Sequence, residues 1–131
     1  MVLIDEHKKP EALAALNLSL ALKPENALAW SNRGTVLLNL GRYQEAIDSY
    51  ERALDIDPDS AYTYCSLASV YNATGESEKA VASAEKALAV DPEFAPAMAN
   101  KAKALRLLGR LKESEILFRK AFELRPELRD H

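Results

Sequence analysis

The histidine and cysteine residues of this sequence, whose side chains often bind metals or act as nucleophiles, are His7, Cys65 and His131. A zinc site needs several ligands held together, whereas the two histidines stand near opposite ends of the chain. A nucleophilic cysteine needs a neighbouring base or cation, and no histidine stands near Cys65 in the sequence. We therefore expect no metal site, no cofactor and no catalytic residues, and we expect that the protein is not an enzyme.

The charged residues are spread along the chain with both signs interleaved. Glu45, Asp48, Glu51 and Asp55 follow one another at helical intervals with Arg52 among them, which is typical of a solvated helix face. The C-terminal third has more arginine and lysine, but glutamates stand between them. Because the net charge is -3 and the sequence has no basic patch and no glycine-rich phosphate loop, we expect no nucleic-acid partner.

The composition is that of a soluble helical protein. Of the 131 residues, 48% are hydrophobic and 28% are charged, and alanine, leucine, glutamate and lysine are abundant helix formers among them. The apolar opening at residues 1–4 is too short for a signal peptide, and no apolar run approaches the roughly 20 residues of a membrane span. One cysteine forms no intrachain disulfide. We expect a cytoplasmic protein with no membrane partner.

Residues of the same type recur along the chain at steps of 34. Proline shows this step most clearly, and glycine, small residues and bulky apolar residues follow it. The recurring sets are Pro24, Pro58, Pro92 and Pro126; Gly41, Gly75 and Gly109; Ala12, Ala46, Ala80 and Ser114; Ser19, Ala53, Ala87 and Ala121; Trp30, Tyr64 and Met98; and Leu20, Leu54, Leu88 and Phe122. Agreement among several residue classes indicates an internal structural repeat.

Each recurring class has a physical role in a pair of helices. Proline lacks an amide hydrogen and ends a helix, and glycine in mid-unit takes the positive φ that lets one helix reverse into the next. Between these residues, Ala46, Ile47, Tyr50 and Ala53 follow the spacing of one helical face. Each unit is therefore predicted to be an antiparallel pair of helices with a glycine-containing turn inside it and a proline-containing turn after it.

The segment from Trp30 to Pro58, with Gly34, Gly41 and Tyr50 at matching positions, resembles the tetratricopeptide repeat signature. The resemblance extends over residues 11–128 and implies an all-α fold, a right-handed superhelical solenoid of antiparallel helix pairs in a single domain. Its parts are a half repeat with only a second helix at 1–26, complete repeats at 27–60, 61–94 and 95–128, and a tail at 129–131.

The second of these complete repeats departs from its neighbours. It has Ser77 and Ala84 at two core positions where the first and third repeats have an aromatic or leucine side chain. Two interpretations stay open. Either the helices pack closer together at this repeat, or the repeat is the loosest part of the stack.

The family resemblance also implies a binding surface, because the first helix of each repeat lines a concave groove where partners bind. The residues that it places there are Asn32, Thr35 and Asn39 in repeat one, Tyr62, Ser66, Ser69 and Asn72 in repeat two, and Asn100, Lys103 and Arg106 in repeat three. Asparagine amides pair with any peptide backbone, and the two cations favour a partner with an acidic group. For any one of these residues, the alternative is a solvated polar side chain with no ligand.

One binding mode of the family is not matched. Members that hold the acidic tails of heat-shock chaperones resemble one another in a clamp of lysine, asparagine and arginine side chains. In this chain the clamp positions hold other residues, namely Ser31, Thr35, Ser66, Pro96 and Asn100. The sequence therefore argues against a chaperone-tail clamp of that type.

The two ends of the predicted solenoid lack the polar caps that such arrays normally have. We expect apolar residues to lie exposed there, Leu13 and Leu16 at one end and Leu117 and Phe122 at the other. Two explanations stay open: the chain is a fragment of a longer array, or these residues join protomers in a homo-oligomer.

Three functions are compatible with these patterns. The first is an adaptor or scaffold that binds a peptide or a helix of another protein in the concave groove. The second is a structural module that assembles through its uncapped terminal helices. The third is a substrate-recruiting segment of a larger enzyme. We expect the first, with another protein or peptide as the partner.

Overall fold

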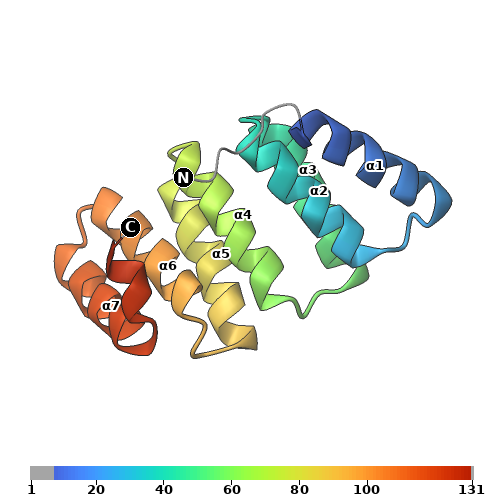
Figure 1. Cartoon of the computed structure of the whole chain (residues 1–131). Helices are drawn as coiled ribbons and strands as arrows, with labels where there is room; N and C mark the ends of the chain where they lie inside the picture. The colour runs from blue at the N-terminus through green and yellow to red at the C-terminus, as the bar shows by residue number, and fades with distance from the viewer. Residues whose placement is uncertain (1–7, 131) are drawn as a thin grey trace. The chain divides into compact units, whose positions relative to one another are not determined.

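A computed structural model of the protein describes residues 8–130, and His7 and His131 lie outside them. These residues form seven α-helices and a short 3₁₀ helix, with no strand among them (Figure 1). The helices are α1 (Lys8–Leu22), α2 (Ala27–Asn39), α3 (Tyr43–Ile56), α4 (Ala61–Ala73), α5 (Ser77–Val90), α6 (Ala95–Leu107) and α7 (Leu111–Leu124), and the 3₁₀ helix is η1 (Pro126–Asp130). The predicted all-α fold class is confirmed.

The chain forms two compact units, with the boundary between Pro58 and Asp59. The first unit contains α1, α2 and α3, and the second contains α4 to α7 with η1. In each unit, helices that are consecutive in the chain pack against each other.

The glycine turns close each helix pair in the same way. Gly41, Gly75 and Gly109 have φ values of +76°, +78° and +82°. After α2, the Gly41 amide donates to the Leu38 carbonyl, and the next amide donates to the Leu37 carbonyl at 2.9 Å. The same two bonds recur after α4 and α6. This pattern satisfies the last carbonyls of the first helix and turns the chain into the second helix, as the spacing of glycine predicts.

The first unit is held by an arginine that joins all three of its helices. Arg33 on α2 donates from Nε to Asn17 Oδ1 on α1 at 2.8 Å, and from Nη1 to Ser49 Oγ on α3 at 2.6 Å. The apolar core beside it includes Leu37 and Tyr50, both with no exposed surface. Hydrogen bonds from a charged donor are stronger than neutral ones, so Arg33 adds to the apolar contacts among these helices.

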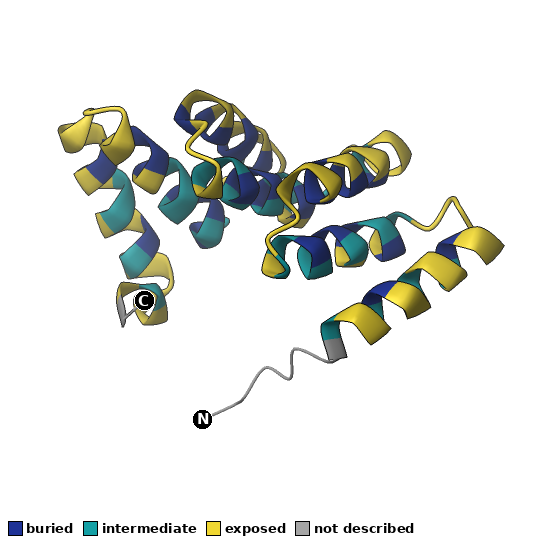
Figure 2. Cartoon of the chain, turned by 90° about the horizontal axis from the view of Figure 1, so that it is seen from above, coloured by how far each residue is buried: buried dark blue, intermediate teal, exposed yellow. Residues whose placement is uncertain are grey.

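The second unit is built on small side chains. Helix α5 buries Ala80, Ala84 and Ala87 completely, and Ser77 is 9% exposed. Figure 2 shows buried positions in the helices of this unit alongside the exposed positions on their outer faces. Because these small residues are sealed from water by their neighbours, the burial favours the first of the two interpretations, in which the helices pack closer together.

The ends of the chain differ from what the sequence suggests. The expected exposure is wrong for Leu13, which is 8% exposed because α1 packs against α2. Leu16 is half-buried. Leu117 is also half-buried, because it packs against the apolar clusters that α6 forms with its neighbours. Residues 126–130 form η1 against α7, so Arg129 belongs to a short helix where a tail was predicted.

Candidate functional site

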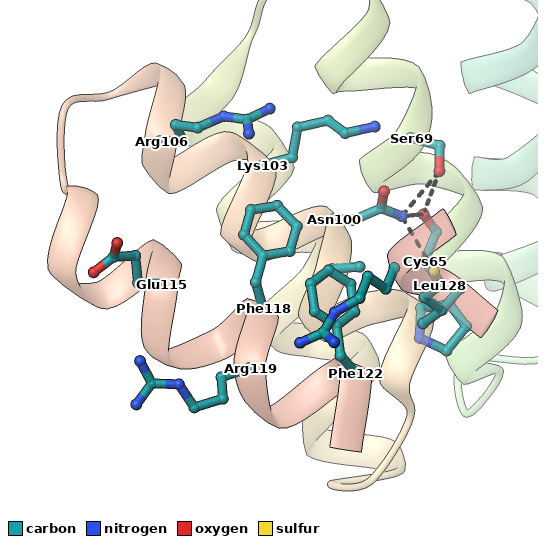
Figure 3. A pocket seen from close by; sticks show the side chains of 13 residues that line it. Cys65, Ser69, Asn100, Lys103, Arg106, Glu115, Phe118, Arg119, Phe122 and Leu128 are labelled. Carbon is teal, nitrogen blue, oxygen red and sulfur yellow. Dashed lines mark hydrogen bonds between the residues drawn. The ribbon is translucent and has the colours of Figure 1, made fainter. Parts of the chain in front are cut away.

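The second unit contains a cavity of about 680 Å³, which we call the α6–α7 pocket. Four elements supply its walls. Cys65 and Ser69 come from α4; Pro96, Ala99, Asn100, Lys103 and Arg106 from α6; Glu115, Phe118, Arg119 and Phe122 from α7; and Leu128 and Arg129 from η1. Figure 3 shows these side chains around the opening.

Helical spacing brings the wall residues to one side of each helix. On α6 the lining positions 96, 99, 103 and 106 are three or four residues apart, and on α7 the positions 115, 118 and 122 are as well. Residues at such spacing are neighbours on a helix surface. The antiparallel pairing of α6 and α7 then turns both faces into a shared cavity.

The charges in the pocket are mostly positive. Lys103, Arg106, Arg119 and Arg129 line it, and among the lining residues Glu115 is the one carboxylate. The four cationic side chains are exposed to solvent. Such an excess favours a ligand with carboxylate or other anionic groups, which arginine binds with two parallel hydrogen bonds.

Two aromatic rings form the apolar part of the pocket. Phe118 and Phe122 are stacked, with ring centroids 5.6 Å apart and an angle of 20° between the ring planes. Arg106 Cζ lies 5.6 Å from the centroid of Phe118, and Arg129 Cζ lies 5.6 Å from that of Phe122. Both rings are half-buried, so part of each remains open to a ligand. The pocket thus offers an apolar surface with a cation at each end.

Asn100 has a role inside the protein that the sequence does not reveal. Its side-chain Nδ2 donates to Ser69 Oγ at 2.9 Å and to the Cys65 carbonyl at 3.1 Å, and lies 3.3 Å from Cys65 Sγ. Asn72 Nδ2 in turn donates to the backbone carbonyl of Asn100 at 3.1 Å. The amide donors of these two residues therefore tie α4 to α6, and they are already engaged where the sequence suggested donors for a peptide.

Replacing Asn100 with alanine should reduce stability, because it removes the hydrogen bonds from its side chain to Ser69 and Cys65 that tie α6 to α4. We expect a loss of about 1–3 kcal/mol in the free energy of unfolding. Urea unfolding followed by circular dichroism would measure it. Asn32→Ala is the matched control, since Asn32 is exposed on α2, and it should change stability by less than about 0.5 kcal/mol. Equal effects of the two substitutions would contradict the structural role.

Cys65 does not have the properties of an activated nucleophile. Burial raises the pKa of its thiol to about 11, and the hydrogen bond from Asn100, which lowers the pKa, opposes this only in part. The thiol is therefore protonated at neutral pH. Among residues 8–130, no group of three or more histidine, cysteine or acidic side chains is arranged to hold a metal ion.

The remaining groove candidates lie outside the pocket. In the first unit, Asn32 and Asn39 are exposed on α2, whereas the Thr35 hydroxyl donates to the Ser31 carbonyl at 3.2 Å and lies 2.9 Å from the hydroxyl of Tyr50. In the second unit, Tyr62 is exposed and Ser66 is half-buried on α4. The pocket brings together four of the candidates, namely Ser69, Asn100, Lys103 and Arg106.

The sequence-based assignment missed most of the α7 and η1 wall. Phe118, Arg119, Leu128 and Arg129 were not expected to bind a ligand, and Phe122 was assigned to self-association. For the two phenylalanines, the 34-residue repeat contains a pattern that could have identified them. Phe118 and Phe122 stand 34 positions after Ala84 and Leu88, two residues on the helix that precedes α6.

Two family models, both described as tetratricopeptide repeat, match the sequence. One covers residues 25–93 and the other covers residues 65–128. The first match alone spans more than half of the chain. The chain belongs to the tetratricopeptide repeat family. A search of curated proteins gave no match.

Solved structures of tetratricopeptide repeat proteins share this fold. A crystal structure of MamA is 27% identical in sequence and superimposes with a TM-score of 0.83 over 94% of this chain and 72% of that one. The first tetratricopeptide repeat domain of Spaghetti (RPAP3), bound to the HSP90 peptide SRMEEVD, is also 27% identical, with a TM-score of 0.74 over 76% of this chain and 79% of that one. These tetratricopeptide repeat structures confirm the predicted solenoid. In the described part of the chain, no helix is both long and apolar enough to cross a membrane.

Proposed function

We propose that this tetratricopeptide repeat chain is an adaptor module that holds a segment of another protein in the α6–α7 pocket, with an acidic group of that segment on the pocket's cations. The observation that carries the proposal is the combination of four cationic side chains with two stacked phenylalanine rings in one cavity. Protein segments with acidic and apolar residues offer both kinds of group, and aromatic and arginine residues dominate binding at protein interfaces.

A related structure supports an acidic partner. The RPAP3 domain binds an HSP90 peptide, SRMEEVD, which contains three acidic residues. The present chain lacks the clamp residues expected for chaperone tails, so its cations must act from other positions. Lys103 and Arg106 on α6, and Arg119 and Arg129 from α7 and η1, are those positions.

The content of the pocket favours binding over catalysis. The Cys65 thiol is protonated at neutral pH, and Glu115 is the one carboxylate among the residues that line the cavity. General acid–base chemistry needs a positioned acid or base, whereas cationic and aromatic side chains that suit binding dominate this lining. We propose that the module has no catalytic activity and that the four repeat segments act as a single domain.

Affinity capture from a cell lysate tests the proposal. The bait is the full chain, compared with its Lys103→Glu/Arg106→Glu variant. We expect the variant to recover specific partners at least about tenfold less well, because like charges would face the acidic group. The matched control is Lys112→Glu/Lys120→Glu, which makes the same change in net charge at two exposed residues outside the pocket. Recovery of the same proteins in equal amounts by all three baits would overturn the proposal.

A further inference from the structure

The walls of the α6–α7 pocket repeat the surface on which α6 itself is seated. We define the counterpart of a residue as the residue 34 positions later in the sequence. Helix α6 packs against α4 and α5, so a helix one repeat later would pack against α6 and α7. The α6–α7 pocket lies at that position.

The α6 wall of the pocket matches the α4 side of this seat. On α4, Cys65 and Ser69 accept hydrogen bonds from the Asn100 side chain, and Asn72 donates to the Asn100 backbone. The counterparts of these three α4 residues are Ala99, Lys103 and Arg106. All three counterparts line the pocket.

The α7 wall matches the α5 side of the seat. Val81 on α5 belongs to a buried cluster with Ala104 and Leu105 of α6, and Leu88 packs against Ala95 and Met98 of α6.

The counterparts of these two α5 residues are Glu115 and Phe122. Phe94 packs beside Ala97 of α6, and the counterpart of Phe94 is Leu128. They too line the pocket. The pocket is therefore shaped as the seat of an α-helix.

We propose that the occupant of the α6–α7 pocket is an acidic amphipathic α-helix of a partner protein, lying on α6 and α7 as α6 lies on α4 and α5. The inference rests on the proposed function and names the partner's structure and charge. Helix α6 has 13 residues, and a helix of similar length would span the pocket. Helix-in-groove binding uses apolar residues at intervals of three and four along one face.

The charge of the occupant follows from one ion pair. Lys101 Nζ on α6 lies 3.5 Å from Glu85 Oε1 on α5. The counterpart of Glu85 is Arg119, so the pocket has a cation at the position where α5 has a carboxylate. An occupant would need a carboxylate where α6 has Lys101. Lys103 and Arg106 add two more cations where α4 has neutral Ser69 and Asn72, which strengthens the preference for an acidic helix.

The size of the wall residues also restricts the occupant. Phe118 and Phe122 are larger than Ala84 and Leu88, whose counterparts they are. Beside Ala84 and Leu88, the space next to α5 is filled by α6. The two larger rings take up part of the corresponding space next to α7, so a helix there would need small residues such as alanine opposite the rings. The face that α6 turns to its own seat already has this character, with Ala97 and Ala104 fully buried.

The helices that correspond to α6 in the other described repeats do not have the required charge. The helices that correspond to α6 in the other repeats are α2 and α4, and neither contains an acidic residue. Helix α1 corresponds to the second helix of a repeat, because Leu20 stands in the series of Leu54, Leu88 and Phe122. We assign the acidic helix to a partner protein, since the first helices of the other described repeats do not match it.

A designed peptide tests this inference on the full chain. The probe has the sequence of residues 95–107 with capped ends, and glutamate replaces Lys101, Lys103 and Arg106. One control is the unmodified sequence, which has the same shape and the opposite charge. A second control is the acidic peptide with proline in place of Ala102, which breaks the helix. Isothermal titration calorimetry measures affinity, and circular dichroism measures helix formation on binding.

We expect the acidic peptide to bind at least about tenfold more tightly than either control and to gain helicity on binding. Its affinity for the chain should fall at high salt. An Arg119→Glu chain should reduce the preference for the acidic peptide at least about tenfold, because the glutamate in place of Lys101 would then meet a carboxylate. Such a charge swap distinguishes the α6-like register from general attraction between opposite charges. A preference that Arg119→Glu leaves unchanged would overturn the register and the inference with it.

The other outcomes separate this inference from the proposed function. If the proline peptide binds as well as the acidic peptide, the pocket takes an extended segment, so the helix is wrong and the adaptor function stands. If no peptide binds while lysate capture still depends on Lys103 and Arg106, the helix is again wrong and the adaptor function stands. If sedimentation shows a dimer that Phe122→Ala dissociates, the occupant is a second copy and the inference is overturned. If the Lys103→Glu/Arg106→Glu variant captures partners from lysate as well as the unmodified chain does, the adaptor function is overturned instead.

Discussion

Replacing Tyr50 with alanine is expected to lower the free energy of unfolding of the first unit by about 3–5 kcal/mol, the range for truncating a buried aromatic side chain. Tyr50 on α3 has no exposed surface. Its hydroxyl lies 2.9 Å from Thr35 Oγ1 on α2, and its ring covers Gly34 so closely that a Cβ atom there would meet ring atom Cε1 at 2.7 Å. The ring therefore fills the space between α2 and α3, and its loss would leave a cavity. Urea unfolding followed by circular dichroism would measure the effect.

The second repeat of the chain supplies the control for this prediction. At the counterparts of Gly34 and Tyr50 it has Ala68 and Ala84, both fully buried. Gly34→Ala alone should destabilise by about 1–3 kcal/mol because the new methyl group overlaps the ring. The double variant Gly34→Ala/Tyr50→Ala should cost less than the two single changes added together, since the methyl group then occupies part of the cavity. Strictly additive costs would show that the ring does not pack on Gly34.

Leu105→Ala is expected to cost about 2–5 kcal/mol, the range for truncating a buried leucine. Leu105 on α6 is 1% exposed and packs in one cluster with Ala80, Val81 and Ala104. Tyr71 of α4 and Leu117 of α7 pack against the same cluster, so the cluster that contains Leu105 joins all four α-helices of the second unit.

Leu107→Ala is the matched control for Leu105→Ala, because it makes the same chemical change two positions away on the same helix. Leu107 is 60% exposed, and its truncation should change stability by less than about 0.5 kcal/mol. Thermal and urea unfolding of both variants measure the difference. Similar losses for the two variants would mean that α6 does not pack through the face that contains Leu105.

The helix pairs could be predicted from the sequence because their boundaries depend on local chemistry. Gly41, Gly75 and Gly109 take positive φ in the structure, where glycine is the residue with the least strain. Burial of the helical faces followed equally from spacing, as the full burial of Ala46 and Ala80 shows. Both signals lie within a few residues of the features that they predict.

The candidate site could be predicted only in part, because its walls come from residues far apart in the chain. Lys103 and Arg106 were found from the first-helix positions of the family. Asn100 shares that register, yet its amide reaches back to Ser69 on α4, a contact between residues 31 positions apart that no local pattern indicates. Phe118 stands 34 positions after Ala84, at a position that the repeat predicts to be in the core. Its half-buried ring lines the pocket because no further helix of the described chain covers α7.

The most direct test of the binding account is nuclear magnetic resonance of the isotope-labelled full chain during titration with the acidic α6-derived peptide. We predict that the signals of Lys103, Arg106, Phe118, Arg119 and Phe122 shift with a common saturation curve, while those of Asn32 and Asn39 on α2 stay unchanged. Shifts confined to α2, or no shifts in the pocket residues at peptide concentrations that saturate binding, would contradict the assignment of the α6–α7 pocket as the binding site.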